Sequence, residues 1–387
     1  MKSRQRLQIL LASTLLLVSS GNLLLSQTKE ESRKQDLPHY DQVLKLESSS
    51  ETSANVEFGD LNGDGNLDVV LAKGRHWPLI NRVLLGDGKG GFLESYDLGP
   101  ESNRTYSSRL TDLDGDGDLD VVVSNDRPDQ NLVYLNDGIG GFKIGSTFGN
   151  ANWPTRNVNV ADINGDGRPD IVVANRYGKS GGSNYICINN GNGKFESEDI
   201  PFSDYPATTI SSADFNKDGL MDLSVPHRNG GQSYVFIQSK KKSLAFDKIP
   251  FGPKNATIRM SQACDLDNDG NMDIVTIDTR NGVIIYYQTG DGSFITSNRL
   301  GDHSINPYAL YVADINQDGL VDIIVGNVKS QSVVQFNHGD GKSFTPVTFG
   351  DGEGNVYGFA IGDLNKDGRL DIAAARSGAP NVVYLAD

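Results

Sequence analysis

The string DLNGDGNLD at residues 60–68 decides the fold, because six variants of it follow along the same chain. They read DLDGDGDLD from residue 112, DINGDGRPD from 162, DFNKDGLMD from 214, DLDNDGNMD from 265, DINQDGLVD from 314 and DLNKDGRLD from 363. Successive copies therefore begin about 50 residues apart, and a regular period of this length indicates a repeat architecture built from small supersecondary units.

Each copy lies in the same pattern of short apolar runs separated by turns. The first string is followed by the strand-like run 69–72, a variable loop, a further run at 82–85, a glycine-rich turn and a last run from Phe92. No amphipathic helical period occurs in the repeats. Four short antiparallel strands per unit are typical of a propeller blade, so we predict an all-β fold, a seven-bladed β-propeller of four-stranded blades.

The two ends of the repeat region complement each other. The last unit stops after its third strand-like run, 382–385, and lacks a fourth. Residues 40–46 precede the first string and resemble the fourth-strand run 92–98. We therefore predict that the N-terminal strand joins the last blade and closes the ring, which removes two exposed sheet edges.

The strings are also predicted metal sites. Positions 1, 3, 5 and 9 are Asp, Asp or Asn, Asp and Asp, and position 6 is always Gly. Hard cations prefer several converging oxygens in a pliable loop, which favours structural Ca²⁺, in up to seven sites, over Mg²⁺. The alternative is a metal-free Asp/Asn/Gly turn. The predicted ligands, with the position-7 carbonyl included, are Asp60, Asn62, Asp64, Asn66, Asp68, Asp112, Asp114, Asp116, Asp118, Asp120, Asp162, Asn164, Asp166, Arg168, Asp170, Asp214, Asn216, Asp218, Leu220, Asp222, Asp265, Asp267, Asp269, Asn271, Asp273, Asp314, Asn316, Asp318, Leu320, Asp322, Asp363, Asn365, Asp367, Arg369 and Asp371.

With these strings the chain resembles the FG-GAP/VCBS repeat β-propeller family, which includes the integrin α-chain propeller and calcium-binding propeller lectins. The resemblance covers residues 37–387 and implies the propeller fold and calcium binding. For function it implies less, because the family includes adhesion modules, lectins and polysaccharide lyases. The motif that names the family is partial here, with Phe58-Gly59 before the first string.

The N-terminal segment has the features of an export signal. Lys2, Arg4 and Arg6 precede the apolar stretch 7–18, and small residues follow it. This pattern predicts a cleaved signal peptide, with an uncleaved anchor as the alternative. The predicted division is a signal peptide at 1–21, a polar linker at 22–36 and the propeller at 37–387. We therefore expect a secreted or periplasmic protein, a monomer whose mature chain has no membrane span.

The charge balance restricts the partners. Fifty acidic residues against 35 basic ones give a net charge of −15, which argues against nucleic-acid binding through a broad basic surface. We expect an acidic glycan or an extracellular protein instead.

The predicted binding surface lies opposite the metal strings. In a four-stranded meander, the loops between the second and third strands share a face with the loops that lead into each blade. Arginines and aromatic residues gather in these loops, a combination suited to anionic sugars. The alternative is that each arginine ties its loop to a local carboxylate. The candidates are Arg75, Arg127, Arg156, Arg176, Arg228, Arg259, Arg280, Lys329, Arg376, Trp77, Tyr106, Trp153, Tyr177, Tyr308 and Tyr357.

Three classes of function fit this surface. The first is a binding module for acidic glycans. The second is a polysaccharide lyase acting on uronate-containing glycans, in which an arginine neutralises the carboxylate and Tyr or His removes the adjacent proton. Its candidate residues are His76, Tyr177, His227 and Arg228. The third is a scaffold for protein–protein adhesion.

Overall fold

The computed structural model describes residues 37–177, 183–195, 199–297, 299–301 and 305–387. Residues Tyr40–Asp387 form one compact unit. The expected signal peptide and linker lie outside the described residues. In the described part of the chain, no helix has both the length and the apolar character needed to cross a membrane.

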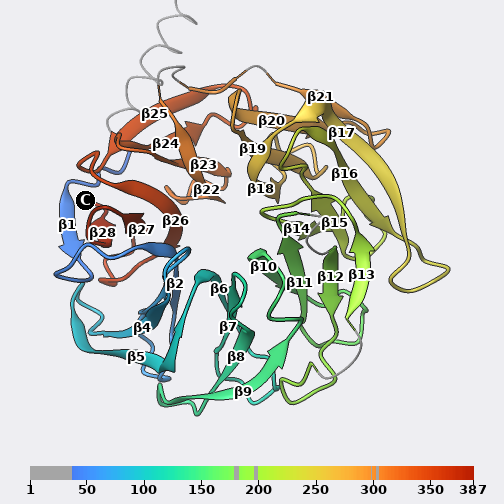
Figure 1. Cartoon of the computed structure of the whole chain (residues 1–387). Helices are drawn as coiled ribbons and strands as arrows, with labels where there is room; N and C mark the ends of the chain where they lie inside the picture. Colours follow the sequence, from blue (N-terminus) through green and yellow to red (C-terminus); the bar gives the residue numbers. More distant parts are fainter. Residues whose placement is uncertain (1–36, 178–182, 196–198, 298, 302–304) are drawn as a thin grey trace, which may run out of the picture. The chain divides into compact units, whose positions relative to one another are not determined.

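The compact unit consists of seven antiparallel sheets of four strands each, numbered here as blades 1–7, and they are arranged in a ring (Figure 1). Blade 1 contains β2 (Ser53–Gly59), β3 (Asp68–Lys73), β4 (Leu79–Gly86) and β5 (Phe92–Asn103); blade 2 contains β6 (Thr105–Thr111), β7 (Asp120–Asn125), β8 (Asn131–Asn136) and β9 (Phe142–Phe148). Blade 3 contains β10 (Thr155–Ala161), β11 (Asp170–Asn175), β12 (Asn184–Cys187) and β13 (Ile200–Ser203); blade 4 contains β14 (Ser211–Ala213), β15 (Asp222–Val225), β16 (Gly231–Gln238) and β17 (Phe246–Ala256). Blade 5 contains β18 (Ile258–Cys264), β19 (Asp273–Asp278), β20 (Gly282–Gln288) and β21 (Phe294–Thr296); blade 6 contains β22 (Pro307–Ala313), β23 (Asp322–Asn327), β24 (Ser332–Asn337) and β25 (Phe344–Phe349). Blade 7 contains β26 (Asn355–Gly362), β27 (Asp371–Ser377), β28 (Val382–Leu385) and, from the other end of the chain, β1 (Gln42–Lys45). The predicted all-β, seven-bladed propeller is confirmed.

The N-terminal strand completes blade 7. β1 pairs antiparallel with β28, with Gln42 opposite Leu385 and Lys45 opposite Val382. Leu46 and Val383 belong to one buried cluster with side chains of blade 1. The two ends of the ring are thereby joined by a full strand ladder, and the outer edge of β28 is covered.

The fourth strand of blade 3 begins later in its repeat than the corresponding strands of the other repeats do. The apolar runs predict that each fourth strand starts at a phenylalanine, and this holds for β5, β9, β17, β21 and β25. In blade 3 the strand β13 starts at Ile200 instead. Phe195 is buried and packs with Phe148 of blade 2, so its side chain serves the core rather than the strand.

The core lies between adjacent blades. Val70 and Val83 of blade 1 pack in one buried cluster with Val121 and Val123 of blade 2. The second strands are buried on both faces, as in β3 and β7. Because each sheet buries its faces against two neighbours, an individual blade depends on the ring for its hydrophobic burial.

The aspartate at position 9 of each string has a structural role in addition to its predicted one. Asp68 is fully buried; its Oδ2 accepts a 2.7 Å hydrogen bond from Leu61 N, and its Oδ1 accepts a 2.8 Å hydrogen bond from Gly86 N. Its six counterparts accept the same pair of backbone hydrogen bonds: Asp120, Asp170, Asp222, Asp273, Asp322 and Asp371. Each therefore fastens its string to the end of the third strand of its blade.

Two positions of every string adopt a left-handed backbone. Position 6 is the expected glycine, such as Gly65 at φ +80°. Position 4 also has positive φ, even where it is not glycine: the values are +59° at Lys217, +57° at Asn268, +59° at Gln317 and +60° at Lys366. A non-glycine residue in this region costs about 1–3 kcal/mol. The whole string therefore holds one fixed loop shape, and the sequence pattern showed only its glycine corner.

Candidate functional site

The innermost strands carry an irregularity at the same place. In six blades the pairing register between the first and second strands shifts near the start of the first strand, as between Thr105 and Ser107 in β6. A bulge of this kind turns one side chain out of the regular alternation. The six residues at the bulges are Ala54, Tyr106, Arg156, Arg259, Tyr308 and Tyr357.

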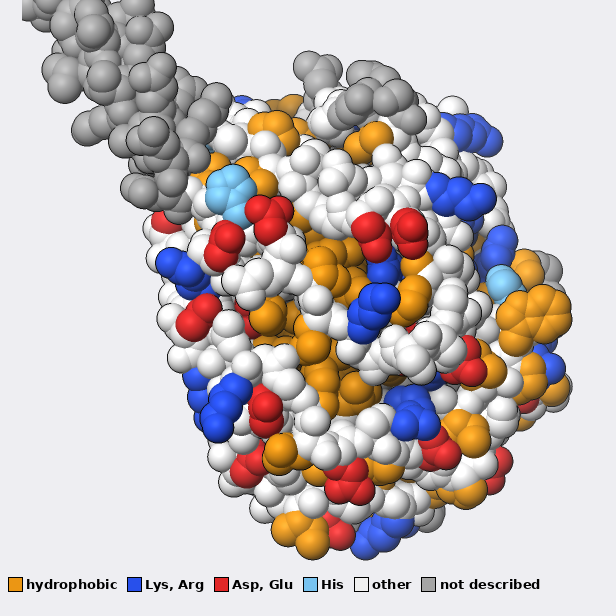
Figure 2. Space-filling view, turned by 90° about the vertical axis from the view of Figure 1, so that its left-hand side faces the viewer, with side chains coloured by type: hydrophobic (Ala, Val, Ile, Leu, Met, Phe, Trp, Pro, Cys, Tyr) orange, Lys and Arg blue, Asp and Glu red, His pale blue; other side chains and the backbone are white. Residues whose placement is uncertain are grey.

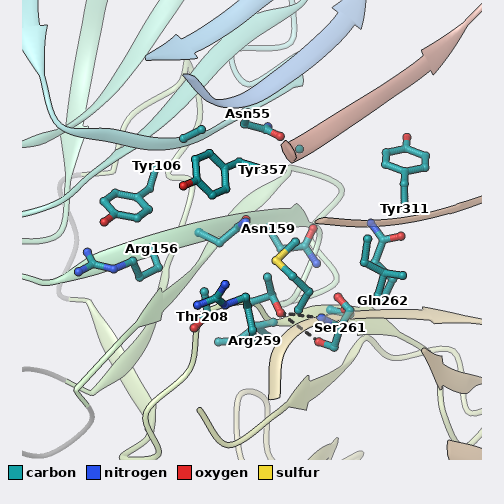
Figure 3. Close-up of a pocket in the computed structure, with 18 of the residues that line it drawn as sticks. Asn55, Tyr106, Arg156, Asn159, Thr208, Arg259, Ser261, Gln262, Tyr311 and Tyr357 are labelled. Atoms are coloured by element: carbon teal, nitrogen blue, oxygen red, sulfur yellow. Dashed lines mark hydrogen bonds between the residues drawn. The ribbon is translucent and has the colours of Figure 1, made fainter. Parts of the chain in front are cut away.

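All six bulge residues line one cavity of about 460 Å³ on the innermost strands of the ring. We call it the central pocket. Figure 3 shows Tyr106, Tyr357, Arg156 and Arg259 around a common space, each from a different blade. In blade 4, Thr208 lines the pocket just before β14. The loops between second and third strands add Arg75, Arg176 and Arg228. Every blade thus contributes to its wall.

Cation–π contacts connect the arginines and tyrosines around the pocket. The guanidinium of Arg75 lies 3.6 Å from the ring centroid of Tyr357, and that of Arg259 lies 3.5 Å from the ring centroid of Tyr308. Arg75 Nη2 also donates a 2.8 Å hydrogen bond to Tyr308 Oη. On the other side, Arg156 lies 4.2 Å from the Tyr106 ring. The contacts fix these side chains in place before any ligand binds.

Several of the guanidiniums have no counter-ion. Arg156 pairs with Asp126 at 2.7 Å. By contrast, Arg176, Arg228 and Arg259 form no ion pair and donate no side-chain hydrogen bond within the described ranges. Burial, together with neighbouring positive charge, lowers the pKa of Arg228 and lowers that of Arg259 to about 10. A chain with a net charge of −15 therefore keeps an excess of positive charge in this one pocket.

Burial by itself would raise the pKa of Tyr308, but Arg75 and Arg259 outweigh it. The pKa of this phenol consequently lies below its usual value of 10.0. The positive potential of the pocket stabilises negative charge on a bound oxygen.

A second layer of polar side chains lies about three residues, or roughly 10 Å, further along the innermost strands toward the metal strings. Arg109 donates to Glu57 at 2.5 Å and to Asn157 at 3.3 Å, which links blades 1, 2 and 3. Asn159 donates to Ser212 at 2.9 Å, and Ser211 donates to the carbonyl of Ser261 at 3.1 Å. The dashed lines at Ser261 in Figure 3 mark its hydrogen bonds with Thr209, which adjoin this layer. We call it the floor of the pocket.

The structure separates the sequence-predicted loop residues into two groups. Arg75, Arg156, Arg176, Arg228, Arg259, Tyr106, Tyr308 and Tyr357 come together in the central pocket. Arg127, Arg280, Lys329, Arg376, Trp77, Trp153 and Tyr177 are not among its lining residues.

Local contacts and exposure explain why some of the other predicted loop residues do not line the pocket. Arg376 is buried and pairs with Asp351 at 2.7 Å, which is the loop-tying alternative. Trp153 stacks on Tyr185 with a centroid distance of 4.1 Å. Trp77 is 69% exposed. A seven-fold ring of loop cations is therefore not what the side chains form.

The lyase candidates are also divided. Of the four, only Arg228 lines the pocket. His76 lies at its edge, with Nδ1 3.0 Å from Tyr106 Oη, and burial and Arg75 lower its pKa. His227 is half-buried and contacts the Tyr205 ring at 6.1 Å, while Tyr177 is exposed. The structure does not bring these side chains together as one acid–base group.

Sequence reasoning missed the floor residues Glu57, Arg109, Asn157 and Asn159. Polar residues alternating with buried valines, as in Asn157-Val158-Asn159, are the signal that could have found them. Such alternation places one face of a strand in the core and the other on a polar space.

The metal strings lie on the opposite side of the blades from the central pocket. In two strings, where position 3 is Asp, three carboxylate oxygens lie within 4.8 Å of one another: Asp112, Asp114 and Asp116, and Asp265, Asp267 and Asp269. The Oδ1 atoms of Asp265 and Asp267 are buried without a hydrogen-bond partner. Buried, unpaired carboxylate oxygens that converge are suited to Ca²⁺, so these residues fit the expected ion.

The seven four-stranded blades and their repeated acidic loops define the class of protein. A sequence model of the FG-GAP-like repeat matches residues 60–123, 112–173, 162–225, 265–325 and 314–374. These segments cover more than half of the chain, and the protein belongs to the FG-GAP-like repeat family.

Solved structures resemble the fold. Two crystal structures of BBS1N in complex with ARL6DN, one soaked with mercury and one with lead, each match with a TM-score of 0.61 and 13% sequence identity. Each match covers 90% of this chain and 97% of the other. At this identity the likeness shows the fold alone. No curated protein sequence matches this chain.

Proposed function

We propose that this protein is an exported, calcium-loaded binding module that holds acidic glycans in the central pocket. The observation that carries the proposal is the set of three guanidiniums without counter-ions, Arg176, Arg228 and Arg259, beside tyrosine rings in one cavity. Arginine binds carboxylate or sulfate through paired hydrogen bonds, and aromatic rings stack on the faces of sugars. A sugar that carries an acid group uses both features.

The outer side of the ring offers less for such a ligand. Figure 2 shows that acidic and basic side chains are interspersed on the side that corresponds to the left of Figure 1. An anionic chain lying there would meet repulsion as well as attraction. The central pocket, by contrast, has one carboxylate in its lining, Glu57, and that carboxylate is paired with Arg109.

The calcium part of the proposal rests on the strings. Ca²⁺ would be held by the carboxylates and amide oxygens of positions 1, 3, 5 and 9, with the position-7 carbonyl. When bound, it neutralises acidic loops that otherwise repel one another. The position-9 aspartates also fasten these loops to the blades through their backbone hydrogen bonds. Export is proposed from Lys2, Arg4, Arg6 and the apolar stretch after them.

The test is a binding titration of the calcium-loaded protein with matched neutral and acidic oligosaccharides, at about 20 mM and about 200 mM salt. We expect the uronate-containing sugars to bind, the neutral ones not to bind, and salt to weaken binding. Equal affinity for both sugars would overturn the proposal. Unsaturated uronate ends appearing during the titration would favour the lyase alternative.

A protein partner is the second candidate. The fold relative BBS1N was crystallised in complex with a protein, ARL6DN, and a propeller has broad loop faces that suit such contacts. This candidate predicts that extracellular protein is retained by the immobilised propeller and that free uronate does not compete with it.

A further inference from the structure

We infer that the central pocket takes the terminal residue of an acidic glycan end-on, with its carboxylate toward blades 3 and 4 and its sugar ring toward the tyrosines of blades 2, 6 and 7. This inference rests on the proposed function and specifies which part of the glycan is recognised. Three features carry it: the closed wall, the hydrogen-bonded floor and the uneven distribution of unpaired polar atoms.

The wall closes the pocket sideways. Its lining includes residues from all seven blades, among them Arg75 of blade 1, Thr208 of blade 4 and Tyr357 of blade 7. A polysaccharide bound along its length needs a groove that is open at both ends. A well surrounded by every blade admits a chain only along the ring axis, with one end first.

The floor offers a ligand few free polar groups. Its side chains are hydrogen-bonded to one another between neighbouring blades, as in Glu57–Arg109–Asn157 and Asn159–Ser212. Groups that already satisfy one another gain little from a ligand. The cavity of about 460 Å³ lies within the range of about 300–1,000 Å³ that holds small ligands, which suits one or two sugar residues.

The unpaired polar atoms lie on one side. Arg156 Nε, Arg176 Nε and Thr208 Oγ1 are buried and have no hydrogen-bond partner, and all three residues line the pocket. Leaving such an atom unsatisfied costs about 1–3 kcal/mol. They belong to blades 3 and 4, where Arg228 also lies. Two guanidinium donors and a hydroxyl match a carboxylate and an adjacent sugar hydroxyl.

The side of the pocket at blades 2, 6 and 7 contributes tyrosine rings. Tyr106, Tyr308 and Tyr357 come from blades 2, 6 and 7, and the last two contact each other with a centroid distance of 4.6 Å. Tyrosine faces contact the C–H groups of a sugar ring without needing hydrogen bonds. The unpaired polar atoms thus lie at blades 3 and 4, while the tyrosine rings, with Arg75 and Arg259 against two of them, lie on the other side, as an acidic sugar has a carboxylate and a ring.

The experiment is calorimetry on the calcium-loaded full chain with glucuronic acid and with oligoglucuronates of increasing length. We expect one protein per oligosaccharide chain at every length, with affinities that stay within about threefold of one another. Several proteins per long chain would show binding to internal residues and overturn this inference, while the proposed function would stand. Absence of binding by every acidic sugar would instead overturn the proposed function.

A variant tests the orientation. Thr208→Val keeps the shape but removes the unpaired hydroxyl, and we expect a roughly fivefold to tenfold loss of affinity, while the melting temperature of the ligand-free protein does not fall. Its control is Arg280→Ala, an exposed loop residue outside the lining, which should change neither. Full affinity in Thr208→Val would contradict the placement of the ligand's polar side at blade 4.

Discussion

Arg75 joins blade 1 to blade 6, because its Nη2 donates a 2.8 Å hydrogen bond to Oη of Tyr308 while its guanidinium lies over the ring of Tyr357 in blade 7. Blade 1 thus meets blades 6 and 7, which are distant from it in the sequence, in one contact at the pocket wall. The contact depends on the closure of the ring, since blades 1 and 7 become neighbours only when β1 pairs with β28.

Removing the phenol of Tyr308 should weaken both the wall and the site. In Tyr308→Phe the ring still faces Arg259, but Arg75 loses its acceptor, and we expect about 1 kcal/mol less stability and weaker binding of acidic sugar. Tyr357→Phe is the matched control, since within the described structure its hydroxyl accepts no hydrogen bond while its ring contacts Arg75. Thermal melts and calorimetry of both variants check this. Equal losses in the two variants would show that only the rings matter.

We expect Arg228 to be needed for ligand binding and to lower the stability of the ligand-free protein. Its guanidinium is half-buried near Arg176 and forms no ion pair in the described part of the chain, with Asp278 as a more distant acidic neighbour. We expect Arg228→Ala to stabilise the ligand-free protein by about 0.5–1 kcal/mol, because one of several clustered positive charges is removed. Chemical denaturation in the absence of ligand measures this. A clear loss of stability would mean that Arg228 has a structural partner.

Two variants of the metal strings should distinguish stability that depends on calcium from stability that does not. Chelation should lower the melting temperature of the wild type, and added Ca²⁺ should restore it. Asp267→Ala removes a predicted ligand whose Oδ1 is unpaired, so its destabilisation should disappear in EDTA. Asp273→Asn disturbs two backbone hydrogen bonds, from Leu266 N and Gln288 N, so it should still cost about 2 kcal/mol in EDTA.

Melting the wild type and both variants with Ca²⁺ and in EDTA shows how far the stability of a string depends on the ion. A wild-type melt that does not change in EDTA would contradict calcium loading. If Asp267→Ala stays destabilised in EDTA, the string is held by its own hydrogen bonds rather than by an ion.

His76 should make the protein less stable in acid. Burial and the nearby Arg75 and Arg156 hold its pKa below 6.5 in the folded state. Below about pH 6.5 the unfolded chain therefore binds more protons than the folded one, and stability falls as the pH falls through this range. We expect His76→Gln to gain stability relative to the wild type between about pH 7.5 and about pH 5.5. Melting both proteins at the two pH values checks this, and a relative loss for the variant would contradict it.

Much of the fold could be predicted from the sequence because every repeat contains the same recognisable acidic string. Seven copies of one string set the number of blades, and residues 40–46 stood out as a strand without a blade. The late start of β13 could not be predicted, because Phe195 looks like every other fourth-strand phenylalanine and packs with Phe148 only in three dimensions.

The site could be predicted only in part. Tyr106, Tyr308 and Tyr357 align with Arg156 and Arg259, and the bulges bring them together as that alignment suggests. The loop cations behave differently because their local partners differ. Arg376 is held by Asp351, whereas Arg228 has no such carboxylate in the described part of the chain. A sequence window shows that a cation is present, but not whether an acid from another loop neutralises it.

The most direct test of the central claim is the affinity of the calcium-loaded protein for glucuronic acid in the wild type, Arg228→Ala and Arg280→Ala. Both arginines occupy the same loop in neighbouring blades, but only Arg228 lines the pocket. We predict at least about a tenfold loss in Arg228→Ala, as expected for a desolvated charge pair, and no change in Arg280→Ala. Equal affinities in all three proteins would contradict acidic-glycan binding in the central pocket.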